Sequence, residues 1–321
     1  MARSAVWLIG TVLLVAPTAS PLGAQVPPAV DARPPAGAVG KTLIGRLPDE
    51  HYFASIETWR AGRIQRLTSP TGWLALIGRH PLPRGTSTVG ADEGNAIRLA
   101  AGPGKLGSIR YNDDGKVTFA LAEGVAATID GTTARTAELV YKGDKPTYVR
   151  SGTINFYILE SGGKLFVRVR DSEAARRKNF AGIEHFPVSL DWRIEADWVP
   201  YDPPRQLRIT NVAGITEDSP CPGKAVFAYQ GRTYELLPVL EEGEERLFFI
   251  ISDATAGTET YEASRFFYAD PPKDGKVILD FNKVYNPPCA FTPFTVCPLP
   301  PKENILPFRL TAGEKKYQGA H

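Results

Sequence analysis

Polar and apolar residues alternate with a period of two along much of this 321-residue chain, which is the pattern of half-buried β-strands. The alternation is cleanest in residues 165–170, where Leu, Val and Val on one face alternate with Phe, Arg and Arg on the other. Turn sequences at residues 112–115 (NDDG) and 130–131 (DG) separate short runs of this kind. We therefore predict a mainly β chain, with antiparallel sheets in sandwich-like or barrel-like layers.

Residues 49–67 follow a different period. Their apolar side chains recur every three or four positions, with arginines between them, and Pro70 ends the run. Asp49 and Glu50 suit the positive N-terminal end of a helix. We predict one amphipathic helix here, and we expect its aromatic stripe to pack against a sheet rather than to serve as a shelf for a ligand.

The stretch from residue 280 to residue 306 (DFNKVYNPPCAFTPFTVCPLPPKENIL) is rich in proline. Proline removes an amide donor and clashes with the preceding helical turn, so this stretch is not expected to be helical. We expect the chain to cross the protein there as an irregular segment whose backbone groups need partners from elsewhere. Its asparagines belong to the residue types that commonly supply such partners.

The N-terminus reads as a secretory signal. Arg3 precedes an apolar run, residues 5–16, that is too short to span a bilayer, and we predict a signal peptide over residues 1–24. Residues 25–45 are rich in Pro, Ala and Gly and predict a disordered leader. We expect an exported, periplasmic or extracellular protein with no membrane span after signal cleavage.

The remaining chain is expected to form two halves. Residues 46–160 would hold the helix and a β-sandwich-like half, and residues 161–317 a second β half that contains the proline-rich stretch. The composition is that of a globular protein, with 43% hydrophobic and 22% charged residues. A formal net charge of +2 is too weak to favour nucleic acid as a partner. The oligomeric state is left open.

Three cysteines, Cys221, Cys289 and Cys297, are an odd number, so at least one thiol is free or pairs with another molecule. Export permits disulfides, and Cys289 and Cys297 are the favoured pair because they are close in sequence. Ligation of zinc by two thiolates and histidine is the rival hypothesis, but the histidines show no ligand spacing relative to the cysteines. We therefore expect neither a metal nor a cofactor.

The loop after residue 252 is the first candidate site, with Asp253, Thr255, Tyr261 and Arg265. Polar loops that follow a rigid strand often carry binding groups, and Arg265 would hold an anion with Asp253 fixing its guanidinium. The alternative is an Asx-type turn at Asp253 and a structural Asp–Arg pair.

Two further groups of polar residues are candidates. Asp280, Asn282 and Asn286 could orient a water molecule or bind a polar ligand, or could instead satisfy the backbone of the proline-rich stretch. Arg170 and Asp171 end a predicted strand, and Arg170 shares a face with Arg168. Two arginines on one face could receive a carboxylate or phosphate, and an exposed sheet face of arginines is the alternative.

Several stretches together resemble the bacterial domain-of-unknown-function family 1684, over about residues 48–317. They are GWLALIG (72–78), LFVRVRDSEA (165–174), FAGIEHFPV (180–188), DATAGTETYEASRFF (253–267), LDFNKVYNPPCAFTPFTVCPLPPKENIL (279–306) and AGEKKY (312–317). The pattern YNPPCAF…CPLPP…N is the most specific of these. The resemblance implies no reaction, because the family has no established activity. Cys221 lies outside these motifs, which favours it as the unpaired thiol.

The N-terminal half also resembles, more weakly, a forkhead-associated β-sandwich in the order of its strands and turns. Ala91 stands where that family has its phosphate-holding arginine, and Tyr111 stands where it has a histidine. The resemblance therefore does not imply phosphothreonine binding, and a fold would not by itself fix a function.

These observations favour a non-catalytic binding or structural protein of the cell envelope, with a small anionic or polar molecule as its ligand. The alternative is a hydrolase of an envelope or extracellular substrate, with Asp253, Arg265, Asp280 and Asn286 in its site. The two hypotheses differ in whether those four side chains meet in one cavity.

Overall fold

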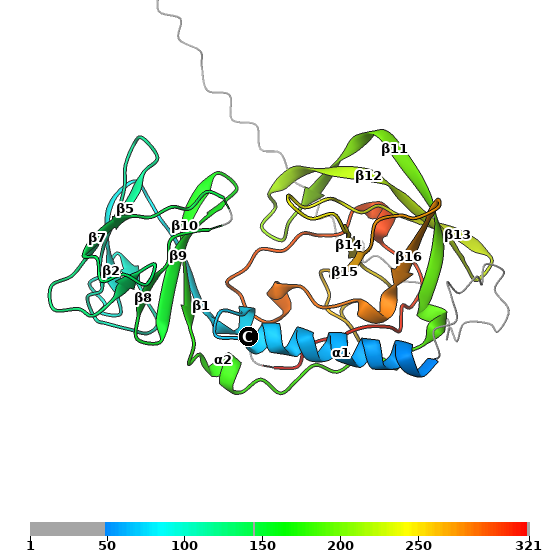
Figure 1. The fold of residues 1–321 in the computed structure, drawn as a ribbon, viewed down its shortest axis with the longest axis horizontal. Helices are drawn as coiled ribbons and strands as arrows, with labels where there is room; N and C mark the ends of the chain where they lie inside the picture. The colour runs from blue at the N-terminus through cyan, green and yellow to red at the C-terminus, as the bar shows by residue number, and fades with distance from the viewer. Residues whose placement is uncertain (1–48, 144, 320–321) are drawn as a thin grey trace, which may run out of the picture.

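The computed structural model describes residues 49–143 and 145–319, which form two β-rich halves beside one long helix (Figure 1). The mainly β architecture with one N-terminal helix confirms the predicted fold class. The signal peptide predicted at residues 1–24 and the leader predicted at residues 25–45 lie outside the described residues.

Helix α1 (Asp49–Thr68) lies where the three- and four-residue spacing predicts it. Its buried stripe includes Ile56 and Leu67, both without exposed surface. Hydrogen bonds tie this stripe to the C-terminal half: the hydroxyl of Tyr52 donates to Asp280 over 2.7 Å. Figure 1 shows α1 running along one end of that half. The helix was expected to lie in one half with the sandwich, over residues 46–160, but the side chains of α1 pack on the C-terminal half.

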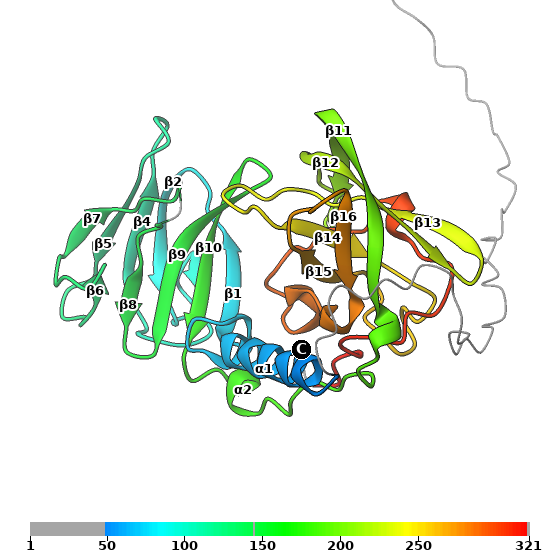
Figure 2. The same cartoon turned by 45° about the vertical axis from the view of Figure 1, so that its right-hand side comes forward.

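The N-terminal half is a sandwich of two five-stranded sheets (Figure 2). One sheet has the order β1 (Leu76–Pro81), β10 (Lys164–Asp171), β9 (Ile154–Ser161), β8 (Val149–Ser151) and β6 (Thr128–Ile129). The other has the order β3 (Ile97–Arg98), β2 (Gly85–Gly90), β4 (Gly107–Tyr111), β5 (Val117–Leu121) and β7 (Thr136–Glu138). Their inner faces share one hydrophobic core, in which Phe119 and Phe156 meet edge to face with ring centroids 5.4 Å apart.

Strand β10 shows the face split that its alternation predicts. Leu165, Val167 and Val169 are buried in the core of the sandwich, and Arg168 and Arg170 lie on the outer face. Since β10 pairs with β9 along its whole length, it belongs to the sandwich. The division expected after residue 160 would cut between these paired strands, so the sandwich extends to the end of β10.

The C-terminal half contains a four-stranded sheet and a two-stranded sheet. The larger sheet has the order β13 (Arg232–Leu236), β12 (Thr216–Tyr229), β11 (Arg193–Thr210) and β16 (Lys276–Asp280), and the smaller one pairs β14 (Leu247–Ile251) with β15 (Arg265–Ala269). β11 continues through the prolines of residues 200–204 with a shift of register against β12. Phe249 and Phe267 stack in the core at 4.7 Å.

Short helical turns join these elements. They are η1 (Trp73–Ala75), α2 (Ala175–Lys178), η2 (Leu190–Trp192), η3 (Phe281–Lys283), η4 (Pro288–Ala290) and η5 (Lys302–Asn304). The last three lie in the proline-rich stretch, which has no longer helix, as expected. Buried Asn304 accepts a hydrogen bond from the amide of Leu237 and donates to the carbonyl groups of Leu237 and Ile250. Asparagine therefore supplies the non-local partners that this stretch needs.

The two halves touch at both ends of their facing sides. A Cβ atom added to Gly162, in the β9–β10 turn, would lie 2.7 Å from Ile215 in the β11–β12 turn. Gly162 also has a positive φ of 56°. Both the close approach of Ile215 and this backbone conformation therefore favour glycine. At the other end the guanidinium of Arg176 lies 5.2 Å from the ring centroid of Phe294.

Candidate functional site

Asp253 and Arg265 form a closed ion pair inside the C-terminal half. The guanidinium of Arg265 lies 2.7 Å from Asp253 Oδ2, and each side chain is 1% exposed. Arg265 also donates to the carbonyl groups of Leu310, Ala312 and Glu314. These contacts match the structural Asp–Arg pair that was the alternative to an anion site.

The remaining oxygen of Asp253 is also engaged. Asp253 Oδ1 accepts hydrogen bonds from the amide and the hydroxyl of Thr255 and from the amide of Leu310. The first of these closes the Asx-type turn that the sequence allowed. Tyr261, further along the loop, is half-buried beside a small cluster that contains Leu67 and Phe291, and burial raises the pKa of its hydroxyl.

A second buried network joins α1, the proline-rich stretch and the C-terminal segment. Glu314 has no exposed surface; it accepts from Arg63 Nε at 3.0 Å and from the amide of Asn286 at 2.7 Å. Asn286 donates from Nδ2 to the carbonyl of Lys315. Glu314 was missed by sequence reasoning, although it lies in the AGEKKY motif, because nothing local shows that a carboxylate is buried.

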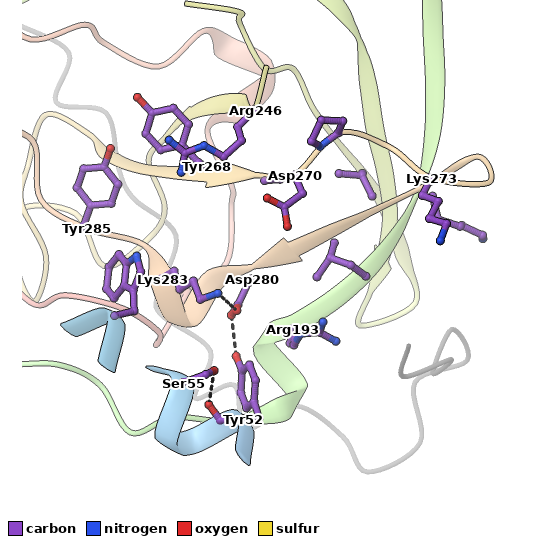
Figure 3. A pocket seen from close by; sticks show the side chains of 16 residues that line it. Tyr52, Ser55, Arg193, Arg246, Tyr268, Asp270, Lys273, Asp280, Lys283 and Tyr285 are labelled. Carbon is purple, nitrogen blue, oxygen red and sulfur yellow. Dashed lines mark hydrogen bonds and ion pairs between the residues drawn. The ribbon is translucent and has the colours of Figure 1, made fainter. Parts of the chain in front are cut away.

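Asp280 belongs to a different environment, at the floor of a cavity (Figure 3), and Asn282 is buried behind it. Asp280 Oδ1 accepts a hydrogen bond from the hydroxyl of Tyr52, and Asn282 Nδ2 donates to the same hydroxyl at 2.9 Å. Lys283 Nζ lies 3.4 Å from the other oxygen of Asp280. Burial, followed by the charge of Asp280, raises the pKa of Tyr52, so its hydroxyl stays a neutral donor.

The cavity has a volume of about 490 Å³ and lies between α1 and the end of the C-terminal half formed by β15 and β16. Its charged and aromatic lining consists of Tyr52, Trp59, Arg193, Arg246, Tyr268, Asp270, Lys273, Lys276, Asp280, Lys283 and Tyr285. Five of these side chains are basic and two are acidic, so the wall carries a net positive charge. Asp253, Arg265 and Asn286 do not line this cavity, so the four residues of the hydrolase hypothesis are not gathered in it.

The aromatic side chains form one wall of the cavity. The rings of Trp59 and Tyr285 lie 6.3 Å apart, and the guanidinium of Arg246 lies 4.5 Å from the ring centroid of Tyr268. Burial raises the pKa of Tyr285 to about 12. The hydroxyl of Tyr268 donates to Glu241, and burial together with this bond raises its pKa as well. The wall therefore presents neutral hydroxyl groups and ring faces at ordinary pH.

Arg170 and Asp171, the remaining candidates, lie on the sandwich and not near this cavity. Arg170 Nη2 lies 3.4 Å from the hydroxyl of Tyr157, and Asp171 Oδ1 accepts from the amide of Glu173. Arg170 thus shares the outer sheet face with Arg168, as the alternation predicts.

Cys289 and Cys297 form a disulfide, and Cys221 is buried and unpaired, as expected. Within residues 49–143 and 145–319 no three His, Cys, Asp or Glu side chains gather closely enough to hold a metal ion. Over the same ranges no helix is both long and apolar enough to cross a membrane.

Residues 178–315 match the model of the family described as "Protein of unknown function (DUF1684)". The match supports the family resemblance for the C-terminal half; the motifs at 72–78 and 165–174 lie outside it. No curated protein matches the chain. An uncharacterized protein of Haloarcula marismortui, solved by solution NMR, is 28% identical over 43% of this chain and 78% of its own, with a TM-score of 0.37.

Proposed function

We propose that this chain is an exported, non-catalytic binding protein of the cell envelope. Its ligand would be a small anionic molecule with a ring, held in the cavity between α1 and the ends of β15 and β16. The observation that carries the proposal is the lining of this cavity, which combines basic side chains with aromatic rings. The disulfide between Cys289 and Cys297 supports export, because such bonds persist in oxidising compartments.

The cationic groups differ in how far they are already neutralised. Lys276 pairs with Asp197, Arg246 with Glu244 and Lys283 with Asp280. Lys273 is exposed, and neither it nor Arg193, which lies over the ring of Tyr52, forms an ion pair with any residue that the structure describes. An anionic ligand would therefore form new charge-assisted hydrogen bonds with these two groups, of which Lys273 is the more exposed.

The aromatic wall would receive the ring of the ligand. Trp59 and Tyr285 are both half-buried, so their ring faces are held in place before a ligand arrives. Aromatic pairs add about 0.5–1.5 kcal/mol beyond the buried area, and pre-organised side chains lose little entropy on binding. In Figure 3, Lys283 lies between Tyr285 and the Tyr52–Asp280 pair.

Asp280 supports recognition rather than proton transfer. Its two oxygens are engaged by Tyr52 and Lys283, and Asn282 fixes the Tyr52 hydroxyl. A general base must instead reach the proton that it removes, with a pKa near the working pH. The proposal therefore assigns Asp280 to the floor of the cavity, where it orients Tyr52.

A matched pair of chromogenic probes tests the proposal. 4-Nitrophenyl glucuronide has a ring and a carboxylate, and 4-nitrophenyl glucoside has the ring without the charge. Calorimetric titration of the purified protein should show binding of the glucuronide, with the glucoside at least tenfold weaker. Lys273→Gln should weaken glucuronide binding about tenfold, which corresponds to about 1.4 kcal/mol. Lys105→Gln, an exposed lysine on the sandwich, serves as the matched control.

The same probe reports hydrolysis, because cleavage releases coloured 4-nitrophenolate. Release that Asp280→Asn abolishes would support the hydrolase hypothesis instead. Equal affinity for the two probes, or for wild type and Lys273→Gln, would contradict the proposed charge recognition.

A further inference from the structure

Three arginines lie together on the outer face of the sandwich sheet. Arg79 on β1 is directly opposite Arg168 on β10, and Arg170 follows on the same face of β10. Directly opposed residues in an antiparallel pair have Cβ atoms about 5 Å apart, and residues two apart on one strand are about 7 Å apart. In both views β1, β9 and β10 lie on the side of the sandwich nearest the C-terminal half (Figures 1 and 2).

Each guanidinium of this cluster rests on an aromatic ring. Arg79 lies 3.4 Å from the centroid of Phe166, Arg168 lies 5.7 Å from that of Trp73, and Arg170 lies 5.0 Å from that of Tyr157. These contacts fix the planes of the guanidinium groups. We call the set Arg79, Arg168 and Arg170, with Trp73, Tyr157 and Phe166, the arginine face.

The arginine face contains no carboxylate partner. Within the described part of the chain none of its three arginines forms an ion pair, and the Nε atom of each is buried without a hydrogen-bond acceptor. Arg168 is only 9% exposed, and its side-chain hydrogen bond goes to the hydroxyl of Tyr157 at 3.3 Å. Burial, together with the charge of Arg168, lowers the pKa of Arg79.

The other deeply buried arginines among the residues that the structure describes are neutralised. Arg63 pairs with Glu314, and Arg265 pairs with Asp253. By contrast, the arginine face brings like charges together in a partly dry environment, and both proximity and burial are unfavourable for folding. An anion bound by the three guanidiniums would offset their mutual repulsion and compensate for the buried charge.

We propose that the arginine face is a second binding site, which takes a multiply charged oxyanion of the phosphoryl or carboxylate class. Guanidinium groups bind both kinds of oxyanion through paired hydrogen bonds. The proposal is independent of the cavity beside α1, since the two sites share no residue.

Calorimetric titration of the whole protein with pyrophosphate and, separately, with citrate tests this proposal. Binding of either is expected, and their relative affinity tells which oxyanion chemistry the site prefers. Arg168→Gln and Arg170→Gln should each weaken binding at least tenfold. Lys273→Gln, in the cavity beside α1, and Arg208→Gln, an exposed arginine on β11, should leave it unchanged.

Thermal melting without ligand separates a binding role from a structural one. If the arginines form an anion-binding site, the ligand-free protein carries unrelieved repulsion between their guanidinium groups. Arg170→Gln reduces this repulsion, so the Tm of the variant should equal or exceed that of wild type. A structural arginine would lower Tm instead. Arg170 is partly exposed, so this variant is expected to fold even where Arg168→Gln does not. Absence of binding for both probes at millimolar concentration, or binding that Arg170→Gln leaves intact, would overturn the proposal.

Discussion

Replacement of Arg265 by alanine removes the cation from the buried Asp253–Arg265 ion pair. Four acceptors lose a donor at once: Asp253 Oδ2 and the carbonyl groups of Leu310, Ala312 and Glu314. The carboxylate of Asp253 keeps its bonds from Thr255 and from the amide of Leu310, but its charge becomes unpaired at 1% exposure.

The expected loss of stability follows from these contacts. Removal of one partner of a buried pair typically costs about 3–5 kcal/mol. Each stranded carbonyl group adds roughly 1 kcal/mol unless water reaches it, and the terms are not additive. We expect about 5 kcal/mol in total. Because domains are stable by only about 5–15 kcal/mol, Arg265→Ala should be close to unfolding at room temperature.

Urea unfolding followed by far-ultraviolet circular dichroism measures this loss. Arg246→Ala is the matched control, because Arg246 also pairs with a carboxylate but is 48% exposed; its loss should stay below about 1 kcal/mol. In an Asp253→Asn background, Arg265→Met should cost clearly less than in wild type, because no buried charge is then left unpaired.

A loss of less than about 1 kcal/mol for Arg265→Ala would refute this reasoning. It would mean that water or a ligand reaches Asp253, and the loop after β14 would again be a candidate anion site. Equal costs of Arg265→Met in the wild-type and Asp253→Asn backgrounds would likewise show that the pair is not coupled.

Two further predictions concern the disulfide and the tyrosines. Non-reducing peptide mapping should recover one crosslink, between Cys289 and Cys297, and serine at both positions should cost about 2–3 kcal/mol in urea unfolding, whereas Cys221→Ser should leave the crosslink in place. Burial raises the pKa of Tyr285 from 10.0 to about 12. The stability that the neutral hydroxyl contributes is therefore complete below pH 10 and is lost as the pH rises to 12. Tyr285 should account for about 3 kcal/mol of the fall in stability over this range, so the fall should be smaller in Tyr285→Phe; an equal fall would contradict the assignment.

The periodic parts of the fold could be predicted from the sequence. The spacing of apolar residues placed α1 within one residue of its observed end, and the alternation in β10 gave the correct inner and outer faces. Proline content correctly excluded a long helix from residues 280–306. These features depend on local stereochemistry, which a single sequence records directly.

The partners of the candidate residues could not be predicted, because they lie far away along the chain. Asp280 is hydrogen-bonded to Tyr52, which is 228 positions away in the sequence, and Glu314 is hydrogen-bonded to Arg63, which is 251 positions away. No local pattern shows such a pairing, so Tyr52 was read only as part of an apolar stripe. The same lack of long-range information explains why α1 was expected to lie in one half with the sandwich.

The position of α1 makes the sandwich an insertion between two parts of the other half of the protein. The helix precedes the sandwich in sequence, but its partners Asp280 and Glu314 follow it, so its apolar stripe stays uncovered until the C-terminal half has been synthesised. The sandwich has its own core, and its ends meet where Leu76 pairs with Arg170. Folding of the sandwich first would shorten the loop between α1 and β11 from on the order of 120 residues to about 30, which lowers the entropic cost of docking the helix by about 1 kcal/mol. The folded sandwich thereby brings α1 close to the chain that begins at β11.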